Sequence, residues 1–239
     1  MQANNVRSST ESQPVSVRAC QTRRAFLRAL PKIITGSAIT AFLATLAAGP
    51  ALADREPAPG QLLSALRNGG YVIYIRHAQT DRSRDDALQP DMKDCSTQRL
   101  LSKEGERQAD ELGNALGELG LPVGQVFCSP FCRTVETARR VLPQHKATEI
   151  AELGRLARVT VNKVPACNAK LRELLSRQPP VGENTVIVGH YENLTTIGGP
   201  DLDEAGWAVF RPEKDTYRLV ARLNPKQWRE LARVTRSRP

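Results

Sequence analysis

The sequence predicts an α/β fold with three α/β/α layers, in which helices cover both faces of a mainly parallel sheet. Two observations lead to this prediction. Short runs of β-branched and aromatic residues alternate along the chain with segments whose apolar residues recur at helical spacing. An alternation of this kind is typical of parallel strands that are connected by helices and buried on both sides.

The first half of the expected domain contains three helices and two strands. Leu62, Leu63 and Leu66 lie at helical spacing, and Gly69 and Gly70 end that helix. In chain order we expect a helix around 62–66, a strand at 71–75, a loop at 76–99, a helix between Ser102 and Gly120, a strand at 123–128 and a helix at 131–142.

The second half ends in a predicted hairpin. Residues 143–167 have no clear periodicity apart from a β-branched run at 158–161, which predicts a short strand. Beyond it we expect a helix around 171–175, a buried strand at 185–189, strands at 207–211 and 217–223 that flank a turn, and a short last helix. Trp207 and Trp228 are interpreted as packing residues, and His145, in a polar loop, is expected to be exposed to solvent.

The positive charge of the chain is concentrated near its start. The net charge is +9, of which residues 1–53 contribute +5 and the remainder +4. The remainder has no long run of basic residues interleaved with aromatic ones, which disfavours nucleic-acid binding. A small positive excess suits an anionic substrate.

Residues 1–53 have the pattern of a signal peptide. A basic segment is followed by a short, weakly apolar stretch at 33–48 and by an Ala-Leu-Ala sequence ending at Ala53. Arg23 and Arg24 lie in a segment that resembles the twin-arginine export motif. We therefore expect cleavage after Ala53, a mature domain at 54–239, a periplasmic or secreted bacterial protein, and contacts with export machinery and membrane only through the leader. An uncleaved membrane anchor is the alternative.

Four cysteines follow the leader: Cys95, Cys128, Cys132 and Cys167. In an exported protein they could form two bridges, and the alternative is four reduced, partly buried thiols. None of their spacings forms a paired zinc-binding set, so a metal site is disfavoured.

Three predicted strands end in residues that suit an anion. The first leads into Arg76 and His77, the second into Ser129 and then Arg133, and the third into His190. Strand ends of a parallel sheet converge on one crevice. Arginine forks match phosphate oxygens, a neutral imidazole can attack phosphorus, and a second imidazole, if protonated, can stabilise charge on the other oxygens.

Four segments resemble motifs of the histidine phosphatase (phosphoglycerate mutase-like) superfamily. Residues 74–80 resemble its Arg-His-Gly signature, 101–109 its next block, 128–138 its second-arginine motif, and 186–190 the strand before its second histidine. The resemblance spans 71–190 in the family's order. It implies a Rossmann-like, phosphoglycerate mutase-like fold without metal or other cofactor. It also implies that His77 is the nucleophile and that Arg76, Arg133 and His190 complete the phosphate pocket.

The chain departs from the family pattern at two places. Ala78 replaces the glycine of the signature, and the general acid is not at a position that the motifs identify. Glu192, two residues beyond His190, is our candidate, and Glu149 and Glu152 are the alternatives. A role of Glu192 as the partner of a nearby arginine also stays open.

The resemblance therefore predicts an exported phosphatase that forms a phosphohistidine on His77. Its substrate would be a small phosphomonoester, a phosphohistidine or a phosphoprotein. The alternatives are a phosphotransferase or mutase of the same family, which the missing mutase insertions disfavour, and a phosphate-binding module without turnover. Cys95 and Cys132 should both border the pocket, so we predict a bridge between them. Among the further arginines Arg82, Arg84, Arg99 and Arg107, Arg99 is the best candidate to extend the anion site.

Overall fold

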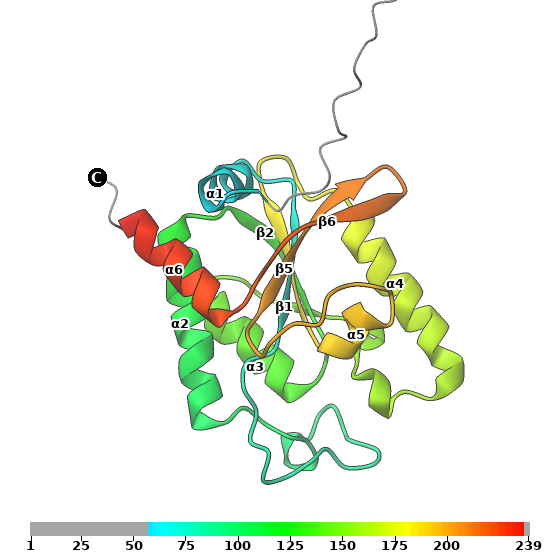
Figure 1. Ribbon diagram of the computed structural model, residues 1–239. Helices are drawn as coiled ribbons and strands as arrows, with labels where there is room; N and C mark the ends of the chain where they lie inside the picture. The colour runs from blue at the N-terminus through cyan, green and yellow to red at the C-terminus, as the bar shows by residue number, and fades with distance from the viewer. Residues whose placement is uncertain (1–56, 237–239) are drawn as a thin grey trace, which may run out of the picture. The chain divides into compact units, whose positions relative to one another are not determined.

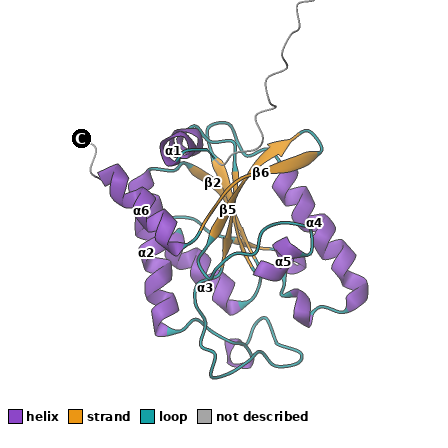
Figure 2. Ribbon diagram, viewed as in Figure 1, coloured by secondary structure: helices purple, strands orange, loops and turns teal. Residues whose placement is uncertain are grey.

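A six-stranded mixed sheet forms the centre of the part of the chain that our computed structural model describes, residues 57–236 (Figures 1 and 2). The strand order is β3-β2-β4-β1-β5-β6. The first four strands in this order are parallel, and β5 and β6 join antiparallel at one edge. The predicted leader and its cleavage site lie outside the described residues.

The strands are short and most are apolar, as the sequence predicts. They are β1 (Val72–Arg76), β2 (Val123–Cys128), β3 (Thr148–Glu149), β4 (Asn184–Gly189), β5 (Trp207–Glu213) and β6 (Thr216–Leu223). All six residues of β4 are buried, which fits its central place in the sheet. The expected hairpin is confirmed as the β5–β6 pair.

Helices cover both faces of the sheet (Figure 1). They are α1 (Pro59–Arg67), α2 (Lys103–Leu119), α3 (Cys132–Val141), α4 (Val164–Ser176), α5 (Tyr191–Thr195) and α6 (Pro225–Arg236). Ile73 and Ile75 of β1 pack in a core with α1, α2, α3 and α6, whereas Val72 and Tyr74 pack in a second core with α4 and α5. The alternation of side chains along a strand thus separates two apolar cores, and the three-layer prediction is confirmed.

The helix ends follow capping rules that the sequence reveals. The Ser102 hydroxyl accepts a hydrogen bond from the Gly105 N–H at 3.0 Å and caps α2. Gly120 ends α2 in a left-handed conformation with φ of 63°. A Cβ on Gly105 would lie 1.8 Å from the Gln79 carbonyl oxygen, so this position needs glycine. Within residues 57–236 no helix is long and apolar enough to cross a membrane.

Two sequence-based predictions are wrong. Residues 158–161 do not form a strand but lie at two short 3-10 helices, Leu156–Arg158 and Val161–Lys163. Val159, Thr160 and Val161 are β-branched, but Thr160 and Val161 are exposed, so the run is not buried in the sheet as a core strand would be. His145 is half-buried rather than exposed, because its Nε2 lies 2.9 Å from the Val123 carbonyl oxygen. Trp207 and Trp228 are buried, as predicted.

Candidate active site

The carboxyl ends of β1, β4 and β2 place three polar residues side by side. His77 follows β1 and its N–H donates to the Gly189 carbonyl at the end of β4 (3.0 Å). Ser129 follows β2 and its N–H donates to the Val188 carbonyl (3.0 Å). As a result the rings of His77 and His190 lie edge to face, with centroids 5.3 Å apart. The predicted convergence of these strand ends is therefore present.

His77 is held in one tautomer. Its Nδ1 lies 2.8 Å from the Ala78 carbonyl oxygen, which can only accept, so Nδ1 carries the proton and Nε2 keeps its lone pair. The Ala78 N–H in turn donates to the Thr137 hydroxyl of α3 at 3.1 Å. Burial, reinforced by the positive charge of Arg133, holds the pKa of His77 well below its usual range. A neutral ring with a free Nε2 is the state that a nucleophile requires.

His190 is fixed from several sides. Its Nε2 lies 3.0 Å from the Ser129 hydroxyl, its N–H donates to Asn193 at 3.1 Å, and its carbonyl accepts from the Tyr74 hydroxyl at 2.8 Å. A Cβ on Gly189 would lie 2.1 Å from the same hydroxyl, so only glycine fits before this histidine. Burial and then Arg133 lower the pKa of His190 well below its usual range, so the ring is neutral in the free protein.

Arg133 is completely buried and binds a carboxylate that the sequence analysis did not single out. Its Nη1 donates to Asp86 Oδ1 at 2.9 Å and its Nη2 lies 3.4 Å from Oδ2. The guanidinium carbon of Arg133 lies 4.6 Å from the centre of the Phe131 ring, whose edge meets His190. Arg133 is therefore connected to His190 through the Phe131 ring, and Asp86 binds the Nη end of its guanidinium.

Arg76, the other predicted phosphate ligand, has a similar environment. Its Nη1 donates to the Leu202 carbonyl at 2.5 Å, and its Nη2 lies 4.0 Å from Glu204. The guanidinium stacks on the Tyr191 ring at 4.9 Å. Arg76 is the last residue of β1, so its charge lies directly before His77 in the chain.

Arg155 connects two acids of the site, and the sequence analysis missed it because residues 143–167 lack periodicity. Its Nη1 donates to Asp86 Oδ2 at 2.9 Å and its Nε donates to Glu192 at 3.2 Å. Arg133, Asp86, Arg155 and Glu192 thus form a row of alternating charges.

The other two candidate acids lie at different places. Glu149 ends β3, is exposed, and borders a groove of about 460 Å³ together with Cys95, Cys132 and Arg133. Glu152 is half-buried near α4, where its charge adds to the effect of burial in raising the pKa of Cys167. The structure therefore brings Glu192 into the charged row beside His190 and places Glu152 beside α4.

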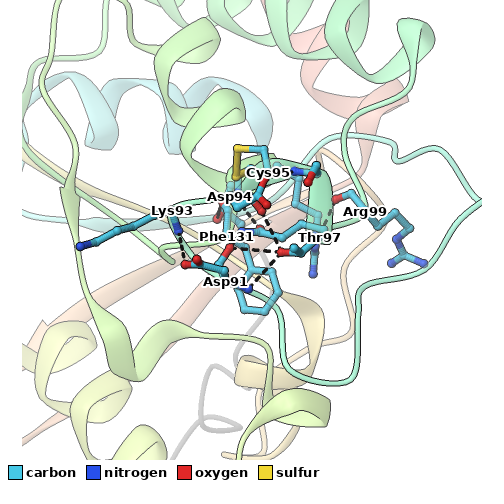
Figure 3. The surroundings of a disulfide bond; sticks show 12 residues. Asp91, Lys93, Asp94, Cys95, Thr97, Arg99 and Phe131 are labelled. Atoms are coloured by element: carbon cyan, nitrogen blue, oxygen red, sulfur yellow. Dashed lines mark hydrogen bonds between the residues drawn. A yellow bond between two sulfur atoms is a disulfide. The ribbon is translucent and has the colours of Figure 1, made fainter.

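A disulfide joins Cys95 to Cys132, as predicted, with a Cα–Cα distance of 5.8 Å (Figure 3). It ties the loop after His77 to the first residue of α3, directly before Arg133. The Cys132 N–H also donates to the buried Gln98 side chain at 2.9 Å. Cys128 and Cys167 are buried free thiols. The loop after His77 is therefore linked covalently to the residue that precedes Arg133.

Of the four further arginines, Arg99 lies nearest to the histidines. Its charge is one of those that lower the pKa of His77, after burial and Arg133. In Figure 3 its side chain points away from the disulfide. Arg82 pairs with Glu204 at 3.5 Å, Arg84 binds the Ser96 carbonyl, and Arg107 pairs with acids on the surface of α2.

Among residues 57–236, no group of three or more His, Cys, Asp or Glu side chains is arranged to hold a metal ion.

Two histidines and two arginines at the strand ends of an α/β sheet form a site that is suited to phosphoryl transfer. Residues 72–166 match the model of the histidine phosphatase superfamily (branch 1). The match covers less than half of the chain, and a phosphatase is the activity that it supports. The matched segment includes His77 and Arg133, whereas His190 lies beyond it.

Several solved structures are similar to this chain at low sequence identity. The protein histidine phosphatase SixA complexed with tungstate is 16% identical, covers 65% of this chain and 97% of its own, and has a TM-score of 0.48. The alpha-ribazole phosphatase from Shigella flexneri is 19% identical, with coverages of 62% and 94% and a TM-score of 0.44. A phosphoserine phosphatase from Entamoeba histolytica is 16% identical, with coverages of 64% and 95% and a TM-score of 0.45. No curated protein matches the chain.

Proposed function

We propose that this phosphatase is exported from a bacterial cell and hydrolyses a phosphomonoester or a phosphohistidine through a covalent phosphohistidine on His77. The observation that carries the proposal is the hydrogen bond from His77 Nδ1 to the Ala78 carbonyl, which leaves Nε2 free on a buried, neutral ring. Among the described histidines, no other ring has its Nδ1 bound to a backbone carbonyl and its Nε2 free beside a buried arginine.

The reaction runs in two steps. His77 Nε2 attacks phosphorus, an N–P bond forms, and the bond to the leaving atom breaks with its electron pair. Water then attacks the phosphohistidine, which releases inorganic phosphate and returns the neutral ring. Arg76, Arg133 and the Nε2 of His190 are the groups positioned to stabilise the charge on the phosphoryl oxygens. A bound phosphate dianion would also favour protonation of His190, which its neighbours disfavour in the free protein.

Glu192 is the proposed general acid for a leaving oxygen. Its place in the first turn of α5, two residues after His190, and its link through Arg155 to the arginine site support this assignment. The alternative role is that of a fixed ion-pair partner of Arg155, whose Nε lies 3.2 Å from Glu192. The two roles, acid and partner of Arg155, therefore make opposite forecasts that can be measured.

The proposal of export rests on the leader and is supported by the disulfide. Disulfides persist in the periplasm and outside the cell and are rare in the reducing cytosol. The Cys95–Cys132 bridge lies within the domain and close to its arginine site. A domain whose loop depends on this bridge is suited to an oxidising compartment. The substrate would then be a phosphorylated metabolite or a phosphoprotein in that compartment.

The test is an assay of the oxidised mature protein, residues 54–239, against an aryl phosphate and a panel of alkyl phosphates, sugar phosphates and phosphohistidine peptides. We expect release of inorganic phosphate from the aryl ester and from part of the panel. His77→Ala should abolish it, because imidazole attack has no substitute at this position. His145→Ala is the matched control and should keep activity, since His145 contacts the carbonyl of Val123, the first residue of β2, at the opposite end of that strand from Ser129. Equal activity of both variants would contradict the proposal.

A further inference from the structure

Arg76 and Arg133 share a pattern of contacts at their guanidinium groups. In each, the Nη atoms contact protein oxygens: Asp86 for Arg133, and Leu202 with Glu204 for Arg76. In each, the Nε–H is buried and has no hydrogen-bond partner among the described residues. A guanidinium has two edges that can bind an anion. In both arginines the Nη end of the guanidinium is bound to protein oxygens, and the Nε–H is left without a partner among the described residues.

A buried donor without a partner is costly in a folded protein unless a ligand satisfies it. Arg133 lies over Phe131 and beside His190, and its charge lowers the pKa of both histidines. Its unpaired Nε–H is therefore a candidate donor for a phosphate attacked by His77. The orientation of this donor depends on what holds the other end of the guanidinium.

Asp86 holds that end, and it is itself firmly fixed. Its side chain has no solvent exposure. Besides Arg133, it accepts from the Arg99 N–H at 2.8 Å and from Arg155 Nη1 at 2.9 Å. Burial alone would raise the pKa of this carboxyl, but the Arg99 N–H, Arg133 and Arg155 together hold the pKa below its usual range. Asp86 is therefore a charged, immobile partner.

We propose that Asp86 is the positioning residue of the phosphate site. It binds the Nη end of Arg133 and thereby presents the Nε–H edge to a phosphate held between His77 and His190. This inference rests on the proposed function and extends it to the loop at 76–99, since Asp86 belongs to that loop and acts only through Arg133. The Cys95–Cys132 bridge ties the same loop to α3.

Asp86→Asn tests the proposal with little change in shape. The new amide nitrogen would face an N–H of Arg133 or Arg155, and two donors cannot form a hydrogen bond. We expect the Arg133 guanidinium, which also loses its charged partner, to change its orientation. We expect kcat/KM for an aryl phosphate to fall about 100- to 1,000-fold, as for the loss of a preorganised donor. The inhibition constant of inorganic phosphate should rise in parallel.

Asp85→Asn is the matched control. Asp85 precedes Asp86 and pairs with Arg155 and Arg158, but it does not contact Arg133, and its side chain is 63% exposed. Exposed pairs contribute little, so kcat/KM and phosphate inhibition should stay within about threefold of the wild type. Equal effects of the two substitutions would overturn the proposal.

A double-mutant cycle separates positioning from a general effect on the fold. If Asp86 acts through Arg133, adding Asp86→Asn to Arg133→Met should cost no more than a further threefold or so in kcat/KM, because coupled residues are non-additive. Losses that multiply, or a folded Asp86→Asn with phosphate inhibition unchanged, would overturn the proposal.

Asp86→Asn leaves the buried charge of Arg133 unpaired and could fail to fold, whereas the double variant removes both members of the pair. If Asp86→Asn does not fold, the comparison of kcat/KM between the double variant and Arg133→Met is sufficient to test the proposal. If the wild type binds inorganic phosphate but hydrolyses none of the phosphorylated substrates, the proposed function is wrong. The role of Asp86 is then tested by the affinity of Asp86→Asn for inorganic phosphate. If the wild type binds no phosphate, both fail.

Discussion

The rings of His77 and His190 meet edge to face at 5.3 Å, although they follow different strands, β1 and β4, which are neighbours in the sheet. Both rings are buried beside Arg133, and both have a pKa well below the usual range. Because both rings stay neutral in the fold, their protonation in the unfolded chain makes the stability of the protein depend on pH.

The first prediction concerns pH. In the unfolded chain both histidines take up a proton below about pH 6.5, but in the fold they stay neutral, so the unfolded state binds more protons. The free energy of unfolding should therefore fall as the pH is lowered from 7 to 5, by at most about 1.4 kcal/mol per ring and pH unit. Urea unfolding of the oxidised wild type and of His77→Ala/His190→Ala at pH 5, 6 and 7 measures it. The same slope in both proteins would contradict this assignment.

The second prediction concerns the disulfide. Cys95 and Cys132 are separated by 37 residues, and closing a loop of this length stabilises a fold by about 3–4 kcal/mol in the chain-entropy model. Cys95→Ser/Cys132→Ser should lower the melting temperature and make it insensitive to reductant. The wild type and the control Cys167→Ala, which keeps the bridge, should melt lower when reduced. A melting temperature of the control that ignores reductant would mean that the bridge is not formed in solution.

The third prediction separates the two roles of Glu192. As a general acid it protonates an alkoxide but is not needed for a phenolate that leaves unaided. Glu192→Gln should then slow alkyl phosphate hydrolysis by about 10²–10⁴-fold and leave aryl phosphate hydrolysis nearly unchanged. Equal losses on both substrates would show that Glu192 serves as the partner of Arg155. Unchanged rates on both would move the acid to Glu149 or Glu152, or indicate a substrate such as phosphohistidine.

The fourth prediction concerns the leader. Changing Arg23 and Arg24 to Lys should retain the protein in the cytoplasm, because the twin arginines are the expected export signal. Cell fractionation and N-terminal sequencing of the exported wild type test this, and the sequence should begin at Asp54. Normal export of the double variant, or a start well before Asp54, would contradict the assignment.

The core strands and the residues at their ends are predictable because each depends on a local pattern. The strand before His77 is apolar from Val72 to Ile75, and the strand before His190 is buried over its whole length. The Cys95–Cys132 bridge is predictable because both cysteines flank residues expected at the pocket. These features need only periodicity, motif order and the rule that parallel strand ends converge.

Asp86 and Arg155 could not be predicted, because their roles arise from tertiary contacts. Asp86 lies in a charged loop where nothing in the local sequence distinguishes it from Asp85, yet one side chain has no exposure and the other is 63% exposed. Arg155 lies in an aperiodic segment in which the sequence predicts only a strand at 158–161, and the structure has 3-10 helices there. Its link to Glu192 also gives that acid a second role that the sequence could only leave open.

The most direct test of the central claim is to trap the phosphorylated enzyme. The oxidised mature protein is mixed with a ³²P-labelled aryl phosphate, quenched in alkali within milliseconds, and analysed by peptide mapping. The label should be on the peptide that contains His77, should be stable in alkali and lost in acid, and should be absent in His77→Ala. Label on another residue, or full hydrolytic activity of His77→Ala, would contradict a phosphohistidine on His77.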